Sequence, residues 1–222
     1  MPIPFPKTYI IRPRECAVAM QVLEFEKKML LVGDAAVGKT SLVRRFVIDK
    51  FDDKYIITVG TKTSRKVLEF VHEPEGVTVY LMLGVWDILG QKEMERTHQM
   101  HFRGAEAYML ILDGTRRDSF DSLKNWADSV QAVCGPIPGV LACNKLDLRD
   151  QFQVSDQELA SIAKELGLTL FFTSAKTGEN VEAAFRLIGD SLCRPILRKY
   201  GGQGGEAAAS STAGKKPGVG GR

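Results

Sequence analysis

KKMLLVGDAAVGKTSLVRRFV, residues 27–47, is the stretch that decides the fold. It joins a short apolar run to a glycine-containing loop and then to a segment with helical spacing. The loop at residues 33–40 matches the pattern GxxxxGK followed by Ser or Thr, in which glycines let backbone N–H groups turn inward around phosphates. We therefore expect a strand, a phosphate-binding loop and a helix in that order. A plain glycine turn is the alternative, and this context disfavours it.

Most residues of the phosphate-binding loop have a predicted task. The backbone N–H groups and the N-terminus of the following helix supply positive potential, and the Lys39 ammonium reaches the β- and γ-phosphates. The Thr40 hydroxyl is placed to ligate Mg²⁺. The candidate phosphate-binding residues of this loop are Gly33, Asp34, Ala35, Ala36, Val37, Gly38, Lys39, Thr40 and Ser41. The loop alone indicates a nucleotide and does not choose between guanine and adenine.

Short β-like runs alternate with helical patterns along the rest of the chain, such as AYMLILD at residues 107–113 and SFDSLKNWADSVQAV at residues 119–133. This alternation predicts an α/β fold of the P-loop NTPase kind, with a six-stranded, mainly parallel sheet flanked by helices. In such sheets, ligands bind at the carboxyl ends of the strands. The loops that follow each apolar run are therefore the places to look for chemistry.

Two helices can be predicted in detail. Ser155 and Glu158 form a capping box and Gly167 a C-terminal cap, which together delimit a helix over residues 155–166. In the last helix, apolar residues recur at three- and four-residue intervals, so one stripe is expected to lie on the sheet. That stripe consists of Val181, Ala184, Phe185, Ile188 and Leu192.

Length and composition fit one domain in a soluble protein: 222 residues, 44% hydrophobic and 26% charged. We expect the chain to be a monomer. We place the domain at residues 25–199, after a proline-punctuated extension at residues 1–24. A Gly/Ala-rich tail follows at residues 200–222, and we expect both ends to be flexible.

Several protein classes are disfavoured. A net charge of +3 with dispersed Lys and Arg argues against nucleic-acid binding. The apolar runs fall short of the roughly 20 residues of a membrane span. Four separated cysteines without a CxxC pair fit the reduced cytoplasm, and the N-terminus lacks a secretory apolar core. An organelle-targeting segment is the weaker alternative.

Guanine specificity is predicted at two later strand ends. Asp147, in the run Asn144 to Asp147, can accept hydrogen bonds from the N1–H and N2 amine of guanine, whereas adenine offers neither donor. The Lys145 stem can cover a face of the base, and Asn144 can brace the loops. Taken alone, each segment could be a solvated turn of small residues. The backbone donors of a second loop could meet guanine O6, and its candidate residues are Ser174, Ala175 and Lys176.

The segment WDILGQ, residues 86–91, follows another apolar run. Asp87 can hold Mg²⁺ through water, Gly90 leaves room for a γ-phosphate, and Gln91 can orient the attacking water.

GDAAVGKT, a threonine near ITVG, WDILGQ, NKLD and TSAK, in this order, resemble the Ras superfamily of small GTPases. Within it the chain looks most like Rab, also through FRGA at residues 102–105 and SFDSLKNW, over residues of about 26 to 194. The resemblance implies a small GTPase domain that binds GTP or GDP with Mg²⁺. It also implies that Thr58 closes on Mg²⁺ and the γ-phosphate and that Phe51 packs against the base.

The resemblance further implies slow hydrolysis, in which Gln91, Gly90, Lys39 and Thr58 take part. The intrinsic rate is expected on the order of 10⁻⁴ to 10⁻² per second, because no arginine finger in cis can be named from the sequence. An exchange factor, a GTPase-activating protein and effectors are implied as partners at the two switch loops.

The chain also departs from the family pattern. Where the family usually has DTAGQE, residues 87–92 read DILGQK, and HEPEG at residues 72–76 lengthens a hairpin loop between Thr58 and Asp87. The methyl groups of Ala35 and Ala36 stand where they would slow hydrolysis or hinder an incoming arginine.

Lipid anchoring is not expected. Cys193 is the last cysteine, so the prenylation sites of Rab proteins are lacking, and Pro2 stands where myristoylation needs glycine. We expect any membrane recruitment to depend on a partner.

The sequence supports two hypotheses about function. The first is a small GTPase switch in trafficking or signalling. The alternative is a GTP-binding interaction module with little hydrolysis, which Ile88 and Leu89 favour. An ATP-using P-loop enzyme is disfavoured by the guanine loops.

Overall fold

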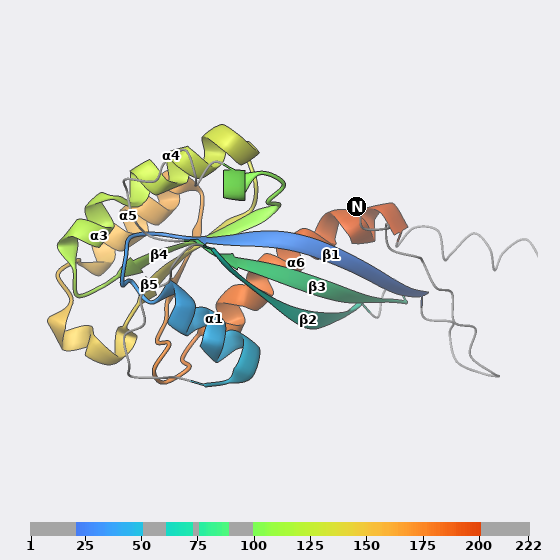
Figure 1. Cartoon of the computed structure of the whole chain (residues 1–222), viewed down its shortest axis with the longest axis horizontal. Helices are drawn as coiled ribbons and strands as arrows, with labels where there is room; N and C mark the ends of the chain where they lie inside the picture. The colour runs from blue at the N-terminus through green and yellow to red at the C-terminus, as the bar shows by residue number, and fades with distance from the viewer. Residues whose placement is uncertain (1–20, 51–60, 73–75, 89–99, 201–222) are drawn as a thin grey trace, which may run out of the picture.

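The computed structural model describes residues 21–50, 61–72, 76–88 and 100–200. It shows a twisted sheet with helices on both faces (Figure 1). The sheet has six strands in the order β2-β3-β1-β4-β5-β6, and every neighbouring pair is parallel except β2 with β3. The predicted six-stranded, mainly parallel α/β sheet is therefore confirmed.

The strands are β1 (Gln21–Val32), β2 (Lys62–His72), β3 (Val77–Asp87), β4 (Ala107–Asp113), β5 (Gly139–Asn144) and β6 (Thr169–Phe172). The helices are α1 (Lys39–Ile48), α3 (Arg117–Asp121), α4 (Leu123–Cys134), the 3₁₀ helix η2 (Leu146–Gln151), α5 (Asp156–Leu166) and α6 (Val181–Tyr200). β1 begins inside the stretch 1–24 that we expected to precede the domain, because Gln21 pairs with Val77 of β3. No helix among these residues is long and apolar enough to cross a membrane.

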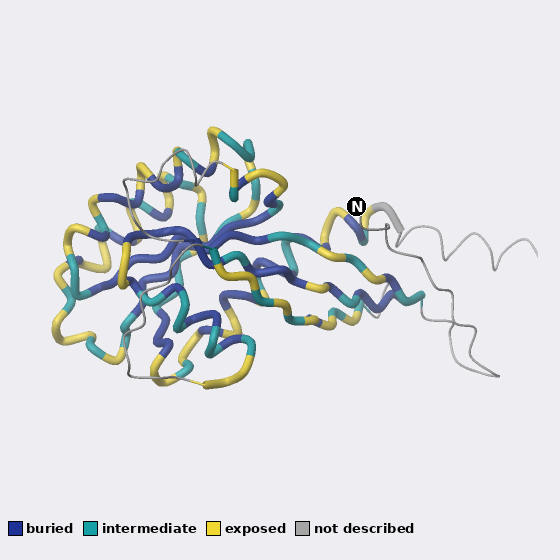
Figure 2. The backbone as a smooth tube through the Cα atoms, viewed as in Figure 1, coloured by how far each residue is buried: buried dark blue, intermediate teal, exposed yellow. Residues whose placement is uncertain are grey.

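The core lies in two layers, one on each face of the sheet. Helices α1 and α6 cover one face, and α4 and α5 cover the other (Figure 1). Side chains alternate between the faces along each strand, so Met29 and Leu31 of β1 join the first layer and Leu30 and Val32 the second. Figure 2 shows that the buried backbone is concentrated in the central strands.

The two helices predicted in detail have the expected features. The Ser155 side chain accepts from the Glu158 N–H while the Glu158 side chain accepts from the Ser155 N–H, and Gly167 ends α5 with a φ of 66°. The predicted α6 stripe is buried in the layer that α6 shares with α1. Its members are Val181, Ala184, Phe185, Ile188 and Leu192.

The parallel strands end at one edge of the sheet. β1 and β3 are neighbours, as are β4, β5 and β6, so the loops that follow these strands meet there. This edge brings the phosphate-binding loop, Asp87 and the loops after β5 and β6 together, and it is the place where α/β sheets bind ligands.

Candidate nucleotide-binding site

The phosphate-binding loop turns sharply between β1 and α1. Gly33 has a φ of 141° and Gly38 a φ of 98°, both in the region that disfavours side chains. A Cβ atom on Gly33 would lie 2.1 Å from the Ile111 carbonyl oxygen, and one on Gly38 would lie 2.2 Å from Nδ2 of Asn144. Glycine is therefore required at both positions by conformation and by space, and at Gly38 the obstacle is a residue of the predicted guanine loop.

Lys39 begins α1 and points back into the loop. Its side chain is buried, and its Nζ donates to the carbonyl oxygens of Gly33 at 2.7 Å and Asp34 at 2.6 Å. Burial lowers the pKa of Lys39 to about 8, although the nearby carboxylates of Asp87 and Asp34 oppose the shift. At pH 7 the group still carries its proton in most molecules, so the loop holds a cation.

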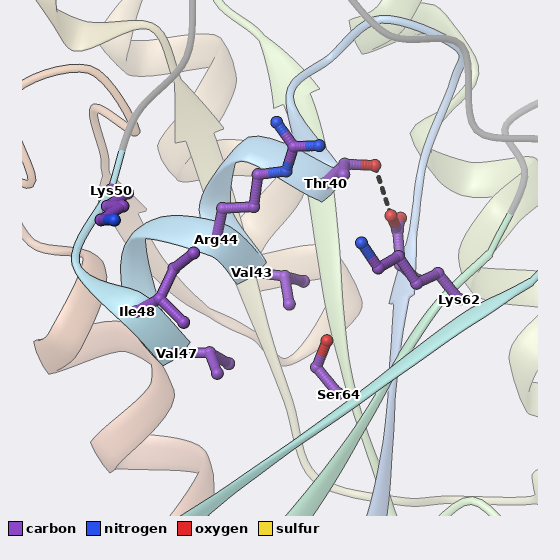
Figure 3. Close-up of a pocket in the computed structure, with 9 residues that line it drawn as sticks. Thr40, Val43, Arg44, Val47, Ile48, Lys50, Lys62 and Ser64 are labelled. Carbon is purple, nitrogen blue, oxygen red and sulfur yellow. Dashed lines mark hydrogen bonds between the residues drawn. The ribbon is translucent and has the colours of Figure 1, made fainter.

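Thr40 and Asp87 form the pair expected to serve a metal ion. The Thr40 hydroxyl donates to Oδ2 of Asp87 (Figure 3). Oδ1 of Asp87 is buried and has no hydrogen-bond partner among the residues that the structure describes. Burial raises the pKa of Asp87, and the Thr40 hydrogen bond opposes that shift. A buried carboxylate oxygen is costly without a partner, and a hydroxyl beside a carboxylate is a donor set that suits Mg²⁺.

A cavity of about 580 Å³ opens beside this pair, between α1 and β2 (Figure 3). Apolar side chains of α1 form one wall, and Lys62 and Ser64 of β2 form part of the other. The lining residues are Thr40, Val43, Arg44, Val47, Ile48, Lys50, Lys62, Ser64 and Asp87. The predicted metal-binding pair, Thr40 and Asp87, thus lines an open cavity.

Asn144 connects the phosphate-binding loop to the loops after β5 and β6. It is buried at the end of β5, where its Nδ2 donates to the Val37 carbonyl oxygen at 2.9 Å. Its Oδ1 accepts from the Ala175 N–H at 3.2 Å. One carboxamide therefore fixes the spacing between the predicted phosphate and guanine subsites.

The predicted guanine-binding residues are also brought together. Oδ1 of Asp147 accepts from the Ser174 hydroxyl at 2.6 Å, which joins the loops after β5 and β6. Arg45 of α1 supports the second loop, because its Nη2 donates to the Lys176 carbonyl oxygen at 2.6 Å. Lys145 adopts a φ of 66°, and its Nζ lies 2.5 Å from Oδ2 of the fully buried Asp113.

Sequence reasoning missed several residues that shape this site. Asp113 ends the apolar strand β4, a position that the strand-end rule used for Asp87 would have singled out. The Trp126 indole donates to Oδ1 of Asp34 at 2.8 Å, and Nη1 of Arg116 donates to the Ala35 carbonyl oxygen at 2.8 Å. Both contacts join segments about 80 to 90 residues apart, so no local sequence pattern predicts them.

Other predicted site residues lie outside the described residues, namely Phe51, Thr58, Gly90 and Gln91. Ile88, the last described residue before that segment, is 1% exposed and packs in the layer with Phe102 and Leu30. Ile88, the first of the two bulky residues in the altered segment DILGQK at residues 87–92 (the second switch), is thus a core residue.

A family model and several known proteins match this chain. The model describes the Ras family and covers residues 28–194. The chain is 36% identical to "Ras-related protein Rab-13" of Mesocricetus auratus over 188 residues, 83% of this chain and 88% of that protein. It is 32% identical to "Ras-related protein Rab-8B" of Homo sapiens over 195 residues, 85% and 91% of the two chains.

A plant protein matches as well. Identity to "Ras-related protein RABA5b" of Arabidopsis thaliana is 33% over 177 residues, 79% of each chain. The matched region contains the lysine-bearing loop, the Thr40 and Asp87 pair and the loops that Asn144 braces. The chain therefore belongs to the Ras superfamily of small GTPases and is most like the Rab proteins within it.

Proposed function

We propose that this chain is a molecular switch that binds GTP and GDP with Mg²⁺, hydrolyses GTP slowly and acts in intracellular trafficking or signalling. The observation that supports this most directly is the double hydrogen bond of Asn144. It holds the phosphate-binding loop at Val37 and the Ala175 loop at a fixed separation, so that one nucleotide can reach both.

Base selection rests on Asp147 in this proposal. Its Oδ1 is held by the Ser174 hydroxyl, which orients the carboxylate and leaves Oδ2 for a ligand. Guanine offers two donors to such a carboxylate, whereas adenine would set a lone pair against it. The Lys145 stem, tethered at its end by Asp113, would lie along the base.

The phosphates and the metal ion would occupy the other half of the site. A triphosphate would offer the Lys39 ammonium charged acceptors in place of the Gly33 and Asp34 carbonyl groups. Mg²⁺, when bound, would neutralise charge on the β- and γ-phosphates. Thr40 would coordinate it directly and Asp87 would hold one of its waters.

The switch itself would lie in residues that the structure does not describe. Thr58 and the Gly90 backbone would be held by the γ-phosphate and released after hydrolysis, and Gln91 would orient the attacking water. An exchange factor, a GTPase-activating protein and effectors would read these loops on a cytoplasmic monomer. Membrane recruitment would depend on such a partner.

The core position of Ile88 favours the second candidate function, a GTP-loaded interaction module that scarcely hydrolyses. A second switch anchored by a residue that is 1% exposed has less freedom to change on hydrolysis. Phosphate release in a single turnover of the GTP-loaded chain separates the two functions, since only the switch releases phosphate within the expected range of about 10⁻⁴ to 10⁻² per second.

Nucleotide retention tests the proposed function. Purified chain should retain radiolabelled GDP and GTP in magnesium and lose both on chelation. Asp147→Asn should weaken GTP binding by about tenfold or more and improve binding of xanthosine triphosphate, because the amide can donate to the xanthine 2-oxo group that the carboxylate repels.

Asp150→Asn is the matched control, since Asp150 is exposed in the same 3₁₀ helix and loses the same charge. It should leave the preference for GTP unchanged. An Asp147→Asn chain that prefers GTP as strongly as the wild type would contradict the account of base selection.

A further inference from the structure

Arg116 places a second cation at the phosphate-binding loop. It stands between β4 and α3 at the carboxyl edge of the sheet, and its Nη1 donates to the Ala35 carbonyl oxygen at 2.8 Å. The two residues are 81 positions apart in the chain. The contact therefore depends on the tertiary fold and brings a guanidinium to a loop built to receive phosphates.

The segment that carries Arg116 is held in place by Asp113. The Arg116 N–H donates to the Asp113 carbonyl oxygen at 3.0 Å, and the Thr115 hydroxyl donates to Oδ1 of the same buried aspartate at 2.7 Å. Asp118 then holds the guanidinium with two hydrogen bonds, at 3.2 Å from Nε and 2.8 Å from Nη2. These contacts direct the Arg116 side chain toward the phosphate-binding loop without a bound ligand.

Arg116 and Lys39 bind consecutive peptide groups. The Asp34 carbonyl oxygen accepts from Lys39 at 2.6 Å, and the Ala35 carbonyl oxygen accepts from Arg116 at 2.8 Å. The positive charge of Arg116 acts on Lys39 and contributes to its lowered pKa. Two cations that repel each other across one loop gain most from an anion that both can reach, and Lys39 is the residue that reaches the terminal phosphates in loops of this pattern.

We propose that Arg116 contacts the γ-phosphoryl group in the transition state of GTP hydrolysis and so acts as an arginine supplied in cis. The inference rests on the proposed function and names a catalytic residue for it. The ion pair with Asp118 is exposed, so the guanidinium can exchange this carboxylate for phosphate oxygens of the same fork geometry. The methyl groups of Ala35 and Ala36, which we expect to hinder an arginine from outside, are compatible with a chain that carries its own.

The chemical step is ordinary hydrolysis. The water oxygen forms a bond to the γ-phosphorus while the bond between that phosphorus and the β–γ bridging oxygen breaks. The electron pair of the broken bond stays on GDP, and the water contributes its second proton to the medium, so that GTP and water give GDP, phosphate and H⁺. Arg116 transfers no proton, and its N–H groups stabilise the negative charge that gathers on the phosphate oxygens.

Single-turnover hydrolysis by the full chain without a partner tests this inference. We expect wild type to work near the upper end of the range, about 10⁻² per second, and Arg116→Ala to be slower by at least about tenfold. Arg116→Lys should recover only part of the rate, because a lysine lacks the planar fork. The affinities for GDP and GTP should stay within about threefold of wild type, which separates a transition-state contact from a structural one.

Arg117→Ala is the matched control. Arg117 is the next residue and also carries a guanidinium, but its hydrogen bonds go to Asp121 at 3.1 Å and Glu158 at 2.6 Å. Removing it should leave the hydrolysis rate unchanged. A second readout is native mass spectrometry with GDP and aluminium fluoride, a mimic of the transferring phosphoryl group. Wild type should form the complex unaided, and Arg116→Ala should bind GDP alone.

Equal hydrolysis rates for wild type and Arg116→Ala, with nucleotide retained by both, would overturn the inference and leave the proposed function standing. A uniform loss of GDP and GTP affinity at an unchanged rate would also overturn it, because Arg116 would then only brace the loop. Failure of wild type to retain guanine nucleotides would remove the proposed function and this inference together.

Discussion

Asn144 forms hydrogen bonds through both the nitrogen and the oxygen of its carboxamide, and it leaves no room for a side chain at Gly38. Its Nδ2 donates to Val37, and the same atom would meet a Cβ on Gly38 at 2.2 Å. A side chain at position 38 would therefore disturb the predicted guanine loops as well as the predicted phosphate-binding loop. The two motifs are thus in direct contact, although Gly38 and Asn144 lie 106 positions apart in the chain.

The lowered pKa of Lys39 predicts a pH dependence of nucleotide binding. Only the protonated Lys39 ammonium attracts phosphate, and burial lowers the pKa of Lys39 in the folded chain to about 8. Well below pH 8 the Lys39 cation is present, and this group adds no pH dependence to the affinity. Above pH 8 the proton must be regained on binding, so the Kd for GDP should rise toward about tenfold per pH unit. Equilibrium dialysis from pH 6.5 to pH 9 measures this.

Lys39→Ala supplies the control for that titration. The Lys39→Ala chain should bind GDP more weakly. The pH dependence that remains in this variant comes from groups other than the lysine, such as the guanine N1–H, which also dissociates in alkaline solution. A wild-type curve that parallels the Lys39→Ala curve would show that the lysine proton is not involved.

The placement of candidate site residues could be predicted where a motif stands at a strand end, as for Lys39 and Asp87; their roles stay predictions. The structure brings Lys39, Thr40, Asp87, Asn144 and Asp147 to one edge of the sheet. The contacts of Arg116 and Trp126 could not be predicted, because each depends on which side chains α3 and α4 turn toward a loop far away in the chain.

The ends of an element could be predicted from sequence where a local cap sets them, and could not where pairing with a distant strand sets them. Helix α5 ends at Leu166, as its caps predicted. The helical pattern at residues 119–133 divides instead into α3 and α4 at Ser122, whose hydroxyl donates back to the Ser119 carbonyl oxygen at 3.3 Å. Such side-chain bonds compete with helix continuation. Strand β1 extends back to Gln21 because β3 pairs with it there, which no pattern in residues 21–24 reveals.

The capping box of α5 should contribute measurably to stability. Ser155→Ala removes the acceptor for the Glu158 N–H and should lower the free energy of unfolding by about 1 kcal/mol. That corresponds to a fall in Tm of roughly 2 to 4 °C. Ser161→Ala, at an exposed position inside the same helix, should leave stability unchanged or slightly raised. Equal losses for both variants would mean that the cap contributes nothing special.

Across the whole molecule, the site ties together loops from both halves of the sheet. Arg45 of α1 donates to Ala175 and Lys176, while Asn144 donates to Val37. A ligand that spans these loops should stabilise the complete fold. The sequence predicted this architecture because alternating strands and helices leave few topologies open.

Nucleotide should raise the thermal stability of the chain by mass action. At a GDP concentration about 100 times its Kd, with magnesium, the folded state gains about 2.7 kcal/mol and Tm should rise by roughly 5 to 10 °C. Differential scanning calorimetry measures the shift, and chelation of magnesium should reverse most of it. ADP at the same concentration is the control, and a shift of equal size with ADP would contradict guanine selectivity.

The chain has two tryptophans, and they stand in different relations to the candidate site. Trp126 is hydrogen bonded to Asp34 of the phosphate-binding loop, and Trp86 directly precedes Asp87. The tryptophan fluorescence of the native protein thus comes from one indole that contacts the predicted phosphate-binding loop and one that directly precedes the predicted metal-binding aspartate. Loading and discharge of the nucleotide can be followed in real time on unlabelled material, and replacing Trp86 by phenylalanine leaves an optical probe that reports on the phosphate-binding loop alone.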